Sequence, residues 1–144
     1  MHDVNKDMEL SRYRFSLAEE TYKSAKMCFD NGFYRDCINR SYYAVFYGVR
    51  AVLALESIDF KRHKDVVAHF NKEFVATGKF PGEMGRRLAR LKMKREESDY
   101  NDFFIASADE AKAQLESVEY ILPLIKKYLE VHNSSFKKSN WWKA

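Results

Sequence analysis

The segment around which this chain is organised reads Cys37-Ile38-Asn39-Arg40-Ser41-Tyr42-Tyr43-Ala44-Val45-Phe46-Tyr47-Gly48-Val49-Arg50-Ala51-Val52-Leu53-Ala54-Leu55. Its only charged side chains are two arginines, it has no proline, and apolar and polar residues do not alternate strictly along it. Wound at 3.6 residues per turn, the segment separates into three faces. A helix that is contacted on nearly all sides lies at the centre of its domain, so we expect the core helix here.

The three faces differ in kind. The first is bulky and apolar, and consists of Ile38, Tyr42, Val45, Phe46, Val49, Val52 and Leu53. The second is small enough for a neighbouring backbone to come close, and consists of Ser41, Ala44, Gly48 and Ala51. The third is polar and aromatic, and consists of Asp36, Asn39, Arg40, Tyr43, Tyr47 and Arg50. A buried guanidinium needs a partner, so this third face indicates either ion pairs within a bundle or the lining of a functional groove.

The composition favours one helical domain. The chain has 144 residues, 46% of them hydrophobic, which is enough for a sizeable core and excludes a disordered chain. With only 5 glycines and 2 prolines, breaks are few and long helices are expected. The net charge of +4 permits nucleic-acid or anionic-ligand binding without requiring it.

Cysteines and histidines do not suggest a metal or cofactor site. Cys28 and Cys37 are too few for a disulfide scaffold or a metal cage, and we expect reduced thiols. The histidines are scattered, and His63 and His69 are six residues apart rather than the three or four that bring ligands to one helix face. His63 is expected at a helix start, either hydrogen-bonded there or facing a ligand. We therefore predict no metal and no cofactor, and, since neither a signal sequence nor a long apolar run is present, a cytoplasmic protein with no membrane contact.

Hydrophobic periodicity predicts an all-α, up-and-down bundle of four long helices plus a short one. Residues 8–30 form the first helix, which Gly32 ends, and the core helix follows as its antiparallel partner. A shorter helix starts near His63, and another runs over 83–98. The last long helix begins with a capping box of Ser107 and Glu110, and Pro123 is expected to bend or divide it.

Arg95 has an unusual position in the helix over 83–98. The apolar line of that helix is Met84, Leu88 and Leu91, and the next position on the line is Arg95. Asp99 lies four residues further on and within reach of it. The other basic residues of the helix are expected on the opposite, solvated side: Arg86, Arg87, Arg90 and Lys94.

The period is lost after residue 133, so we divide the chain into a bundle over 1–133 and a basic tail over 134–144. The tail contains the pair Trp141-Trp142. It is interpreted either as a frayed terminus or as a segment that docks on a partner or an anionic surface.

Several blocks of the sequence, in the same order, resemble the HEPN domains of bacteria and archaea. The first block is Gly32-Phe33-Tyr34-Arg35-Asp36-Cys37-Ile38-Asn39-Arg40-Ser41-Tyr42-Tyr43-Ala44-Val45-Phe46-Tyr47. The later ones are His63-Lys64-x-Val66, Phe74-Val75-x-Thr77-Gly78 and Arg95-x-x-x-Asp99-Tyr100. The resemblance covers roughly 10–131 and implies a helical bundle that usually dimerises. It also implies a partner, because such proteins often accompany a minimal nucleotidyltransferase as toxin and antitoxin.

The sequence departs from the family's ribonuclease motif, an arginine followed four to six residues later by a histidine. Arg95 matches the arginine, but 96–102 contain no histidine. Arg62 and His69 have the spacing in another helix, where seven residues place them roughly 10 Å apart along the axis, and we interpret them as a chance match. Without histidine the motif lacks the side chain best suited to proton transfer near neutral pH, so a non-enzymatic role is favoured.

Three functional hypotheses follow. The favoured one is a homodimeric binding module whose cleft holds a nucleotide or RNA without cutting it. Its predicted ligand-binding residues are Arg95, Asp99, Tyr100, Arg40, Tyr43, Arg50 and His63. The second is a divergent metal-independent ribonuclease that uses Arg95. The third is a protein whose aromatic surface binds a nucleotidyltransferase, with little contact to nucleic acid.

Overall fold

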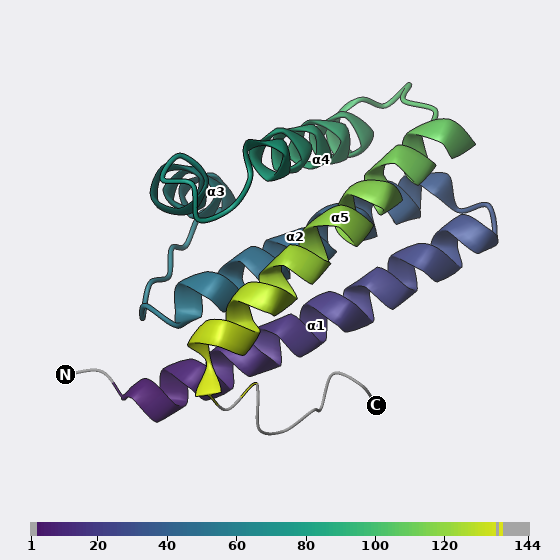
Figure 1. Ribbon diagram of the computed structural model, residues 1–144. Helices are drawn as coiled ribbons and strands as arrows, with labels where there is room; N and C mark the ends of the chain where they lie inside the picture. Colours follow the sequence, from purple (N-terminus) through teal and green to yellow (C-terminus); the bar gives the residue numbers. More distant parts are fainter. Residues whose placement is uncertain (1–2, 135, 137–144) are drawn as a thin grey trace.

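The computed structural model describes residues 3–134 and 136, and within them it is an all-α bundle of the predicted kind (Figure 1). Four helices are long and one is short. They are α1 (Val4–Asp30), α2 (Tyr34–Ala54), α3 (His63–Phe70), α4 (Gly82–Tyr100) and α5 (Ala108–His132). A π-helical turn, η1 (Asn71–Val75), continues α3. The predicted fold class is therefore confirmed.

Helix α2 is the core helix, as its three faces predicted. It packs against α1, α3, α4 and α5, and every residue of its bulky and small faces is buried. Gly48 marks the closest approach to α5, because a Cβ atom there would lie 3.0 Å from both Ile125 Cδ1 and Leu122 Cδ2. On the α1 side, the Ser11 hydroxyl donates to the Ala51 carbonyl at 2.6 Å. The small face of α2 therefore lets both α5 and α1 pack closely against it.

The turn between α1 and α2 follows from Gly32, whose φ of +79° is left-handed. The N–H of Phe33 donates to the Cys28 carbonyl at 2.8 Å, and that of Gly32 donates to the Phe29 carbonyl at 3.1 Å. These two bonds form a Schellman motif, which satisfies carbonyls at the helix end. The capping box of Ser107 and Glu110 is likewise present at the start of α5.

One helix bound differs from the prediction, and of the two outcomes expected at Pro123, a bend or a division, the division is wrong. Helix α1 begins at Val4 rather than near Met8, because the Asp3 carboxylate accepts from the backbone N–H groups of Asn5 and Lys6. Helix α5 is not divided at Pro123 but continues to His132. The apolar stripe of α5 is buried on both sides of the proline. This packing stabilises the helix beyond Pro123, although the proline interrupts its backbone hydrogen bonds.

Two of the four basic residues expected in solvent on α4 face α5 instead. The Arg87 guanidinium carbon lies 4.7 Å from the Tyr120 ring centre, and its Nη1 donates to Ser117 at 3.2 Å. Lys94 Nζ lies 3.0 Å from a Glu110 oxygen. Long basic side chains can lay their apolar stems on a neighbouring helix, which helical periodicity alone does not reveal. Arg86 and Arg90 are exposed, as predicted.

The end of α5 returns to the start of α1 (Figure 1). Asn133 Nδ2 donates to the Met8 carbonyl at 3.1 Å. Phe136 is fully buried, and its ring meets that of Phe15 edge-on, with centres 5.5 Å apart. The pair Trp141-Trp142 lies outside the described residues. Among residues 3–134 and 136, no helix combines the length and apolarity needed to cross a membrane.

Candidate functional site

The centre of the candidate site is Arg95, which α4 directs at the aromatic residues of α2. Its guanidinium carbon lies 5.4 Å from the ring centre of Tyr42 and 5.5 Å from that of Tyr43, within cation–π range. Its Nη2 donates to the Tyr43 hydroxyl at 3.2 Å. The side chain remains 18% exposed, so the guanidinium is held by rings yet reachable from solvent.

Asp99 supplies the charge partner one helical turn further along α4. Arg95 Nε lies 3.0 Å from Asp99 Oδ2, but the N–H does not point at that oxygen, so this is an ion pair without a hydrogen bond. The Asp99 side chain is 31% exposed. Water therefore screens the pair, and the aspartate does not hold the arginine as firmly as a buried partner would.

His63, the first residue of α3, joins the same group of rings. Its ring centre lies 4.1 Å from that of Phe46 and 5.8 Å from that of Tyr43. Burial lowers the pKa of His63, and the positive charges of Arg95 and Arg50 lower it further. The imidazole is therefore neutral at neutral pH, when it can accept a proton.

A hollow of about 360 Å³ adjoins His63 at the start of α3. Arg50 Nη2 lies 3.1 Å from both carboxylate oxygens of Asp59, and Arg14 Nη2 lies 3.2 Å from one of them. Burial raises the pKa of Asp59, but Arg50 and Arg14 more than offset it and hold that pKa below its usual value. Two guanidinium groups share one carboxylate here, which leaves net positive charge beside the hollow. Its lining residues are Phe46, Arg50, Asp59, Phe60, Lys61 and His63.

The structure brings together most of the residues predicted for the site. Arg95, Tyr43 and His63 surround one group of rings, Asp99 pairs with Arg95, and Arg50 lies across Phe46, with its guanidinium carbon 5.9 Å from that ring centre. We refer to Arg95, Tyr43 and His63, with the Tyr42 and Phe46 rings between them, as the arginine–aromatic cluster.

Two predicted residues lie apart from the arginine–aromatic cluster. Tyr100 ends α4 with 75% of its surface exposed. Arg40 is exposed, and its charge acts on the Cys28 thiol of α1. Burial and Asp36 raise the pKa of that thiol, and Arg40 offsets part of the rise. Although Arg40 shares a predicted helix face with Tyr43, its charge acts on a residue of α1 and not on the arginine–aromatic cluster.

The sequence prediction missed several site residues. The sequence assigns Tyr42 to the apolar face, and the residue is indeed fully buried. Its ring nevertheless also contacts the Arg95 guanidinium. Burial raises its pKa to about 12, with Arg95 opposing the rise. Asp59, Phe60 and Lys61 lie in the connection between α2 and α3, which has no periodicity to interpret. The one available signal was an acidic residue, Asp59, close in sequence to the end of a helix that carries a half-buried arginine.

Other candidate chemistry receives no support from the geometry. Arg62, which has the motif spacing to His69, pairs with Asp65 at 2.8 Å, whereas the His69 ring contacts Phe60. Burial raises the pKa of Cys37 to about 11, so this thiol is a poor nucleophile. Over the described part of the chain, no three His, Cys, Asp or Glu side chains gather as metal ligands would.

A family model for the HEPN domain matches residues 11–128. This chain belongs to the HEPN family. A UPF0332 protein of Thermotoga maritima is 34% identical over 127 residues, which cover 88% of this chain and 96% of the relative. A Methanocaldococcus jannaschii protein named "Putative toxin MJ0605" is 31% identical over 128 residues, covering 88% of this chain and 95% of the relative. The same organism has "Putative toxin MJ0142", 31% identical over 130 residues, with 86% and 88% covered.

Proposed function

We propose that this HEPN-domain protein is a homodimeric module that binds a nucleotide or RNA and acts in a toxin–antitoxin pair with a minimal nucleotidyltransferase. The observation that carries the proposal is the arginine–aromatic cluster, in which a partly exposed guanidinium lies on two tyrosine rings beside His63. A guanidinium pairs with phosphate oxygens, and aromatic rings stack on bases. Tyr42 is fully buried, so the rings available to a base are the partly exposed ones of Tyr43 and His63. With the Arg95 guanidinium, they would supply both requirements of nucleotide binding within one short stretch of surface.

The adjoining hollow extends this surface for a longer ligand. Lys61 is exposed there, and Arg50 and Arg14 leave one positive charge beyond what Asp59 neutralises. Phe60 is 37% exposed and available for stacking. A phosphate held by Arg95 and the next held near Arg50 and Lys61 would fit a short single strand that passes over His63.

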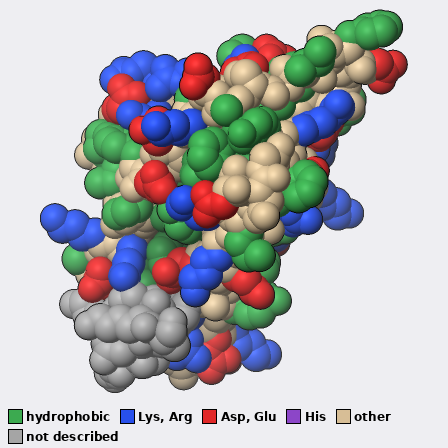
Figure 2. Space-filling model, turned by 90° about the vertical axis from the view of Figure 1, so that its right-hand side faces the viewer, with side chains coloured by type: hydrophobic (Ala, Val, Ile, Leu, Met, Phe, Trp, Pro, Cys, Tyr) green, Lys and Arg blue, Asp and Glu red, His purple; other side chains and the backbone are tan. Residues whose placement is uncertain are grey.

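The toxin side of the proposal is supported by the names of the two M. jannaschii relatives. An interface is supported by the loop between α4 and α5, where Phe103 is 90% and Ile105 86% exposed, next to Tyr100. Figure 2 shows hydrophobic side chains on the projecting upper corner, at the height of this loop in Figure 1. Exposed apolar side chains in one short loop are typical of a surface that meets another protein chain. We assign this loop to the dimer or nucleotidyltransferase interface.

The test combines a mass measurement with an RNA titration. Light scattering coupled to size exclusion should give twice the 17.0 kDa chain mass. Fluorescence anisotropy with a labelled single-stranded RNA should show binding that weakens as salt rises from about 50 to 200 mM, with a log–log slope of about −0.7 for each phosphate contacted. A monomer mass would remove the dimer from the proposal. Absence of binding even at low salt would remove the nucleic-acid function.

The position of His63 favours a second function, metal-independent RNA cleavage. This alternative is supported by the contacts of His63 and Arg95, which both contact Tyr43. In it, His63 of α3 takes the role of the histidine that is absent after Arg95 in the sequence. A neutral imidazole next to a guanidinium provides a proton acceptor and an electrostatic group for a phosphoryl oxygen. In this alternative, His63 takes a proton from the attacking hydroxyl and Arg95 stabilises the charge on the phosphate.

A histidine exchange separates cleavage from binding. With a chelator present, His63→Gln should lower the rate of RNA cleavage about 10²- to 10⁴-fold, the usual contribution of a general base, while binding stays within a few-fold. Because the pKa of His63 is lowered, the wild-type rate should be level at neutral pH and fall only below about pH 6.5. His69→Gln, in the same helix, is the matched control and should retain the rate. If the wild-type dimer binds RNA but leaves it intact, the binding function stands and the ribonuclease is excluded.

A further inference from the structure

Asp59 lies at the centre of an ion-pair group that joins α1, α2 and the connection after α2. Both of its carboxylate oxygens are 3.1 Å from Arg50 Nη2, and one of them is 3.2 Å from Arg14 Nη2. Arg14 Nη1 also donates to the backbone carbonyl of Arg50 at 3.3 Å. Burial lowers the pKa of Arg14 and the charge of Arg50 lowers it further, whereas Asp59 opposes the change. The two guanidinium groups repel each other, and an anion between them offsets this repulsion.

The anion is the most exposed member of this group. The Asp59 side chain is 53% exposed, whereas those of Arg14 and Arg50 are 11% and 26% exposed. Arg50 lies across the Phe46 ring, and Arg14 is held by the carbonyl of the neighbouring helix. Asp59 belongs to the irregular connection between α2 and α3, where its Oδ1 also accepts from the backbone N–H of Phe60 at 2.9 Å. An exposed carboxylate therefore covers two arginines that the helices hold in place.

A phosphodiester offers an arginine the same features as this carboxylate, one negative charge and two equivalent acceptor oxygens, and arginine pairs with both kinds of anion. Arg50 uses only Nη2 toward Asp59, and its Nε has no hydrogen-bond acceptor among residues 3–134 and 136. Arg50 and Asp59 also line the hollow beside His63, so a ligand in that hollow lies next to the pair. An ion pair with an exposed carboxylate is screened by water and contributes little stability. A phosphate that releases counterions when it binds can therefore replace the carboxylate at little cost.

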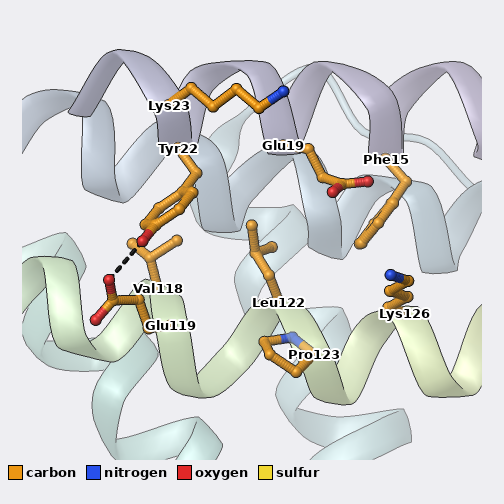
Figure 3. Close-up of a pocket in the computed structure, with 9 residues that line it drawn as sticks. All are labelled: Phe15, Glu19, Tyr22, Lys23, Val118, Glu119, Leu122, Pro123 and Lys126. Carbon is orange, nitrogen blue, oxygen red and sulfur yellow. Dashed lines mark hydrogen bonds between the residues drawn. The ribbon is translucent and has the colours of Figure 1, made fainter. Parts of the chain in front are cut away.

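A larger hollow of the molecule lacks this excess of positive charge. It is a groove of about 420 Å³ between α1 and α5 (Figure 3). Two carboxylates and two ammonium groups line it: those of Glu19, Glu119, Lys23 and Lys126. The Tyr22 hydroxyl donates to Glu119 there. Because these charges balance, an added anion gains no net attraction in the groove, and we expect it at Arg14 and Arg50 instead.

We propose that Arg14 and Arg50 form a phosphate subsite, which the Asp59 carboxylate occupies in the free protein in place of a phosphate. When RNA binds, one of its phosphodiester groups replaces the carboxylate on the two guanidinium groups, and Asp59 turns toward solvent. The inference rests on the proposed function, to which it adds Arg14 and this exchange of anions. Arg50 follows Tyr43 by seven residues on α2, about 10 Å along the helix axis. One short strand can therefore contact both the subsite and the arginine–aromatic cluster.

Neutral exchanges of Asp59 test the subsite by the sign of their effect on RNA affinity. A subsite that is free about one-tenth of the time lowers the apparent affinity about tenfold, so Asp59→Asn should bind a labelled single-stranded RNA about tenfold more tightly than the wild type. Asp59→Ser, a second neutral exchange, should show the same gain. Asp65→Asn is the matched control, because Asp65 also pairs with an arginine, Arg62, and its exchange should tighten binding no more than about twofold through the general charge.

Weaker binding by Asp59→Asn would show that the carboxylate holds the arginines in place for RNA, and would overturn the proposal. Equal gains in Asp59→Asn and Asp65→Asn would overturn it as well. In an Arg50→Ala background, the gain from Asp59→Asn should fall to that from Asp65→Asn, because a double-mutant cycle isolates the coupling between the two residues. An undiminished gain without the Arg50 guanidinium would contradict the subsite.

Orthophosphate without RNA separates failure of the subsite from failure of the proposed function. When phosphate replaces chloride at constant ionic strength, the melting temperature of Asp59→Asn, followed by circular dichroism, should rise more than those of the wild type and Asp65→Asn, because only its subsite is open to a free anion. These two proteins also account for the general stabilisation that phosphate gives. An extra rise in Asp59→Asn without RNA binding by any variant would keep the subsite and remove the nucleic-acid function. An equal rise in all three proteins would overturn the subsite, whether or not RNA binds.

Discussion

Replacing Phe74 with alanine is expected to lower the free energy of unfolding by roughly 3–5 kcal/mol, the usual cost of deleting a buried phenyl ring. Phe74 is fully buried in η1. Its ring stacks on Phe70 at 5.3 Å between centres and meets Tyr128 of α5 edge-on at 6.1 Å. The exchange therefore removes both a large buried area and two aromatic contacts.

This aromatic group has a second role, since it fixes the position of α3. Phe70 and Phe74 lie on one side of the α3–η1 segment, and with Phe80 they form the contact that attaches it to Tyr128. His63 begins the same segment, so its position beside Phe46 depends on this attachment. A core residue remote from the cluster thus supports the geometry of the cluster.

Urea denaturation followed by circular dichroism measures the effect of Phe74→Ala. Tyr13→Ala is the control, because Tyr13 lies on α1 away from the arginine–aromatic cluster and from the interface loop, is 65% exposed, and its loss should change the free energy of unfolding by no more than about 0.5 kcal/mol. Equal midpoints for the two variants would show that the aromatic group contributes little to stability, contrary to the packing described above.

Much of the fold could be predicted because the information is local. The faces of α2 repeat every three or four residues, and the same period identifies the stripe of α5. Helix ends were predictable where a specific residue makes the cap, such as Gly32 or Ser107. The bounds failed at Val4, where the cap by Asp3 lies in a segment with no apolar stripe.

The site could be predicted only in part, because it depends on contacts between segments distant in sequence. Arg95 was identified by its core-facing position, and Tyr43 by its place on the third face of α2. Residue spacing could not predict that His63 lies close to Tyr43 and Arg95. These two hydrogen-bonded residues are 52 positions apart in the sequence, and α3, which begins with His63, folds back between them. Asp59 and Lys61 lie in an irregular connection, where no period indicates which way a side chain points.

Substituting Arg95 by alanine tests whether this residue is structural or binds a ligand. In the structural alternative, its removal would strand Asp99 as a buried charge and destabilise the bundle by a few kcal/mol. The geometry favours the other alternative. Asp99 is 31% exposed and can be hydrated by water, and a partly exposed ion pair contributes only about 0–1 kcal/mol.

We expect Arg95→Ala to weaken RNA binding by about 1–3 kcal/mol, or about 5- to 150-fold, the scale of a lost charge-assisted contact to phosphate. The melting temperature should fall by only a few degrees, since the Tyr42 and Tyr43 rings lose a cation–π partner of about 1 kcal/mol and keep their other contacts. Fluorescence anisotropy with labelled RNA and thermal melts followed by circular dichroism measure the two quantities on the same preparation.

Arg86→Ala and Arg90→Ala are the matched controls on α4. Both side chains are exposed and both pair with Glu83, so each exchange removes a positive charge without touching the aromatic rings. They should weaken binding slightly, and only through the salt-dependent attraction of the whole surface. A strongly destabilised Arg95→Ala that binds RNA with native affinity per folded molecule would make Arg95 a structural residue. Equal losses of affinity in all three variants would show that RNA binds through the general positive charge of α4. Arg95 lies on Tyr42 and Tyr43, whereas Arg86 and Arg90 face water, so only a specific contact to RNA would make the loss at Arg95 larger.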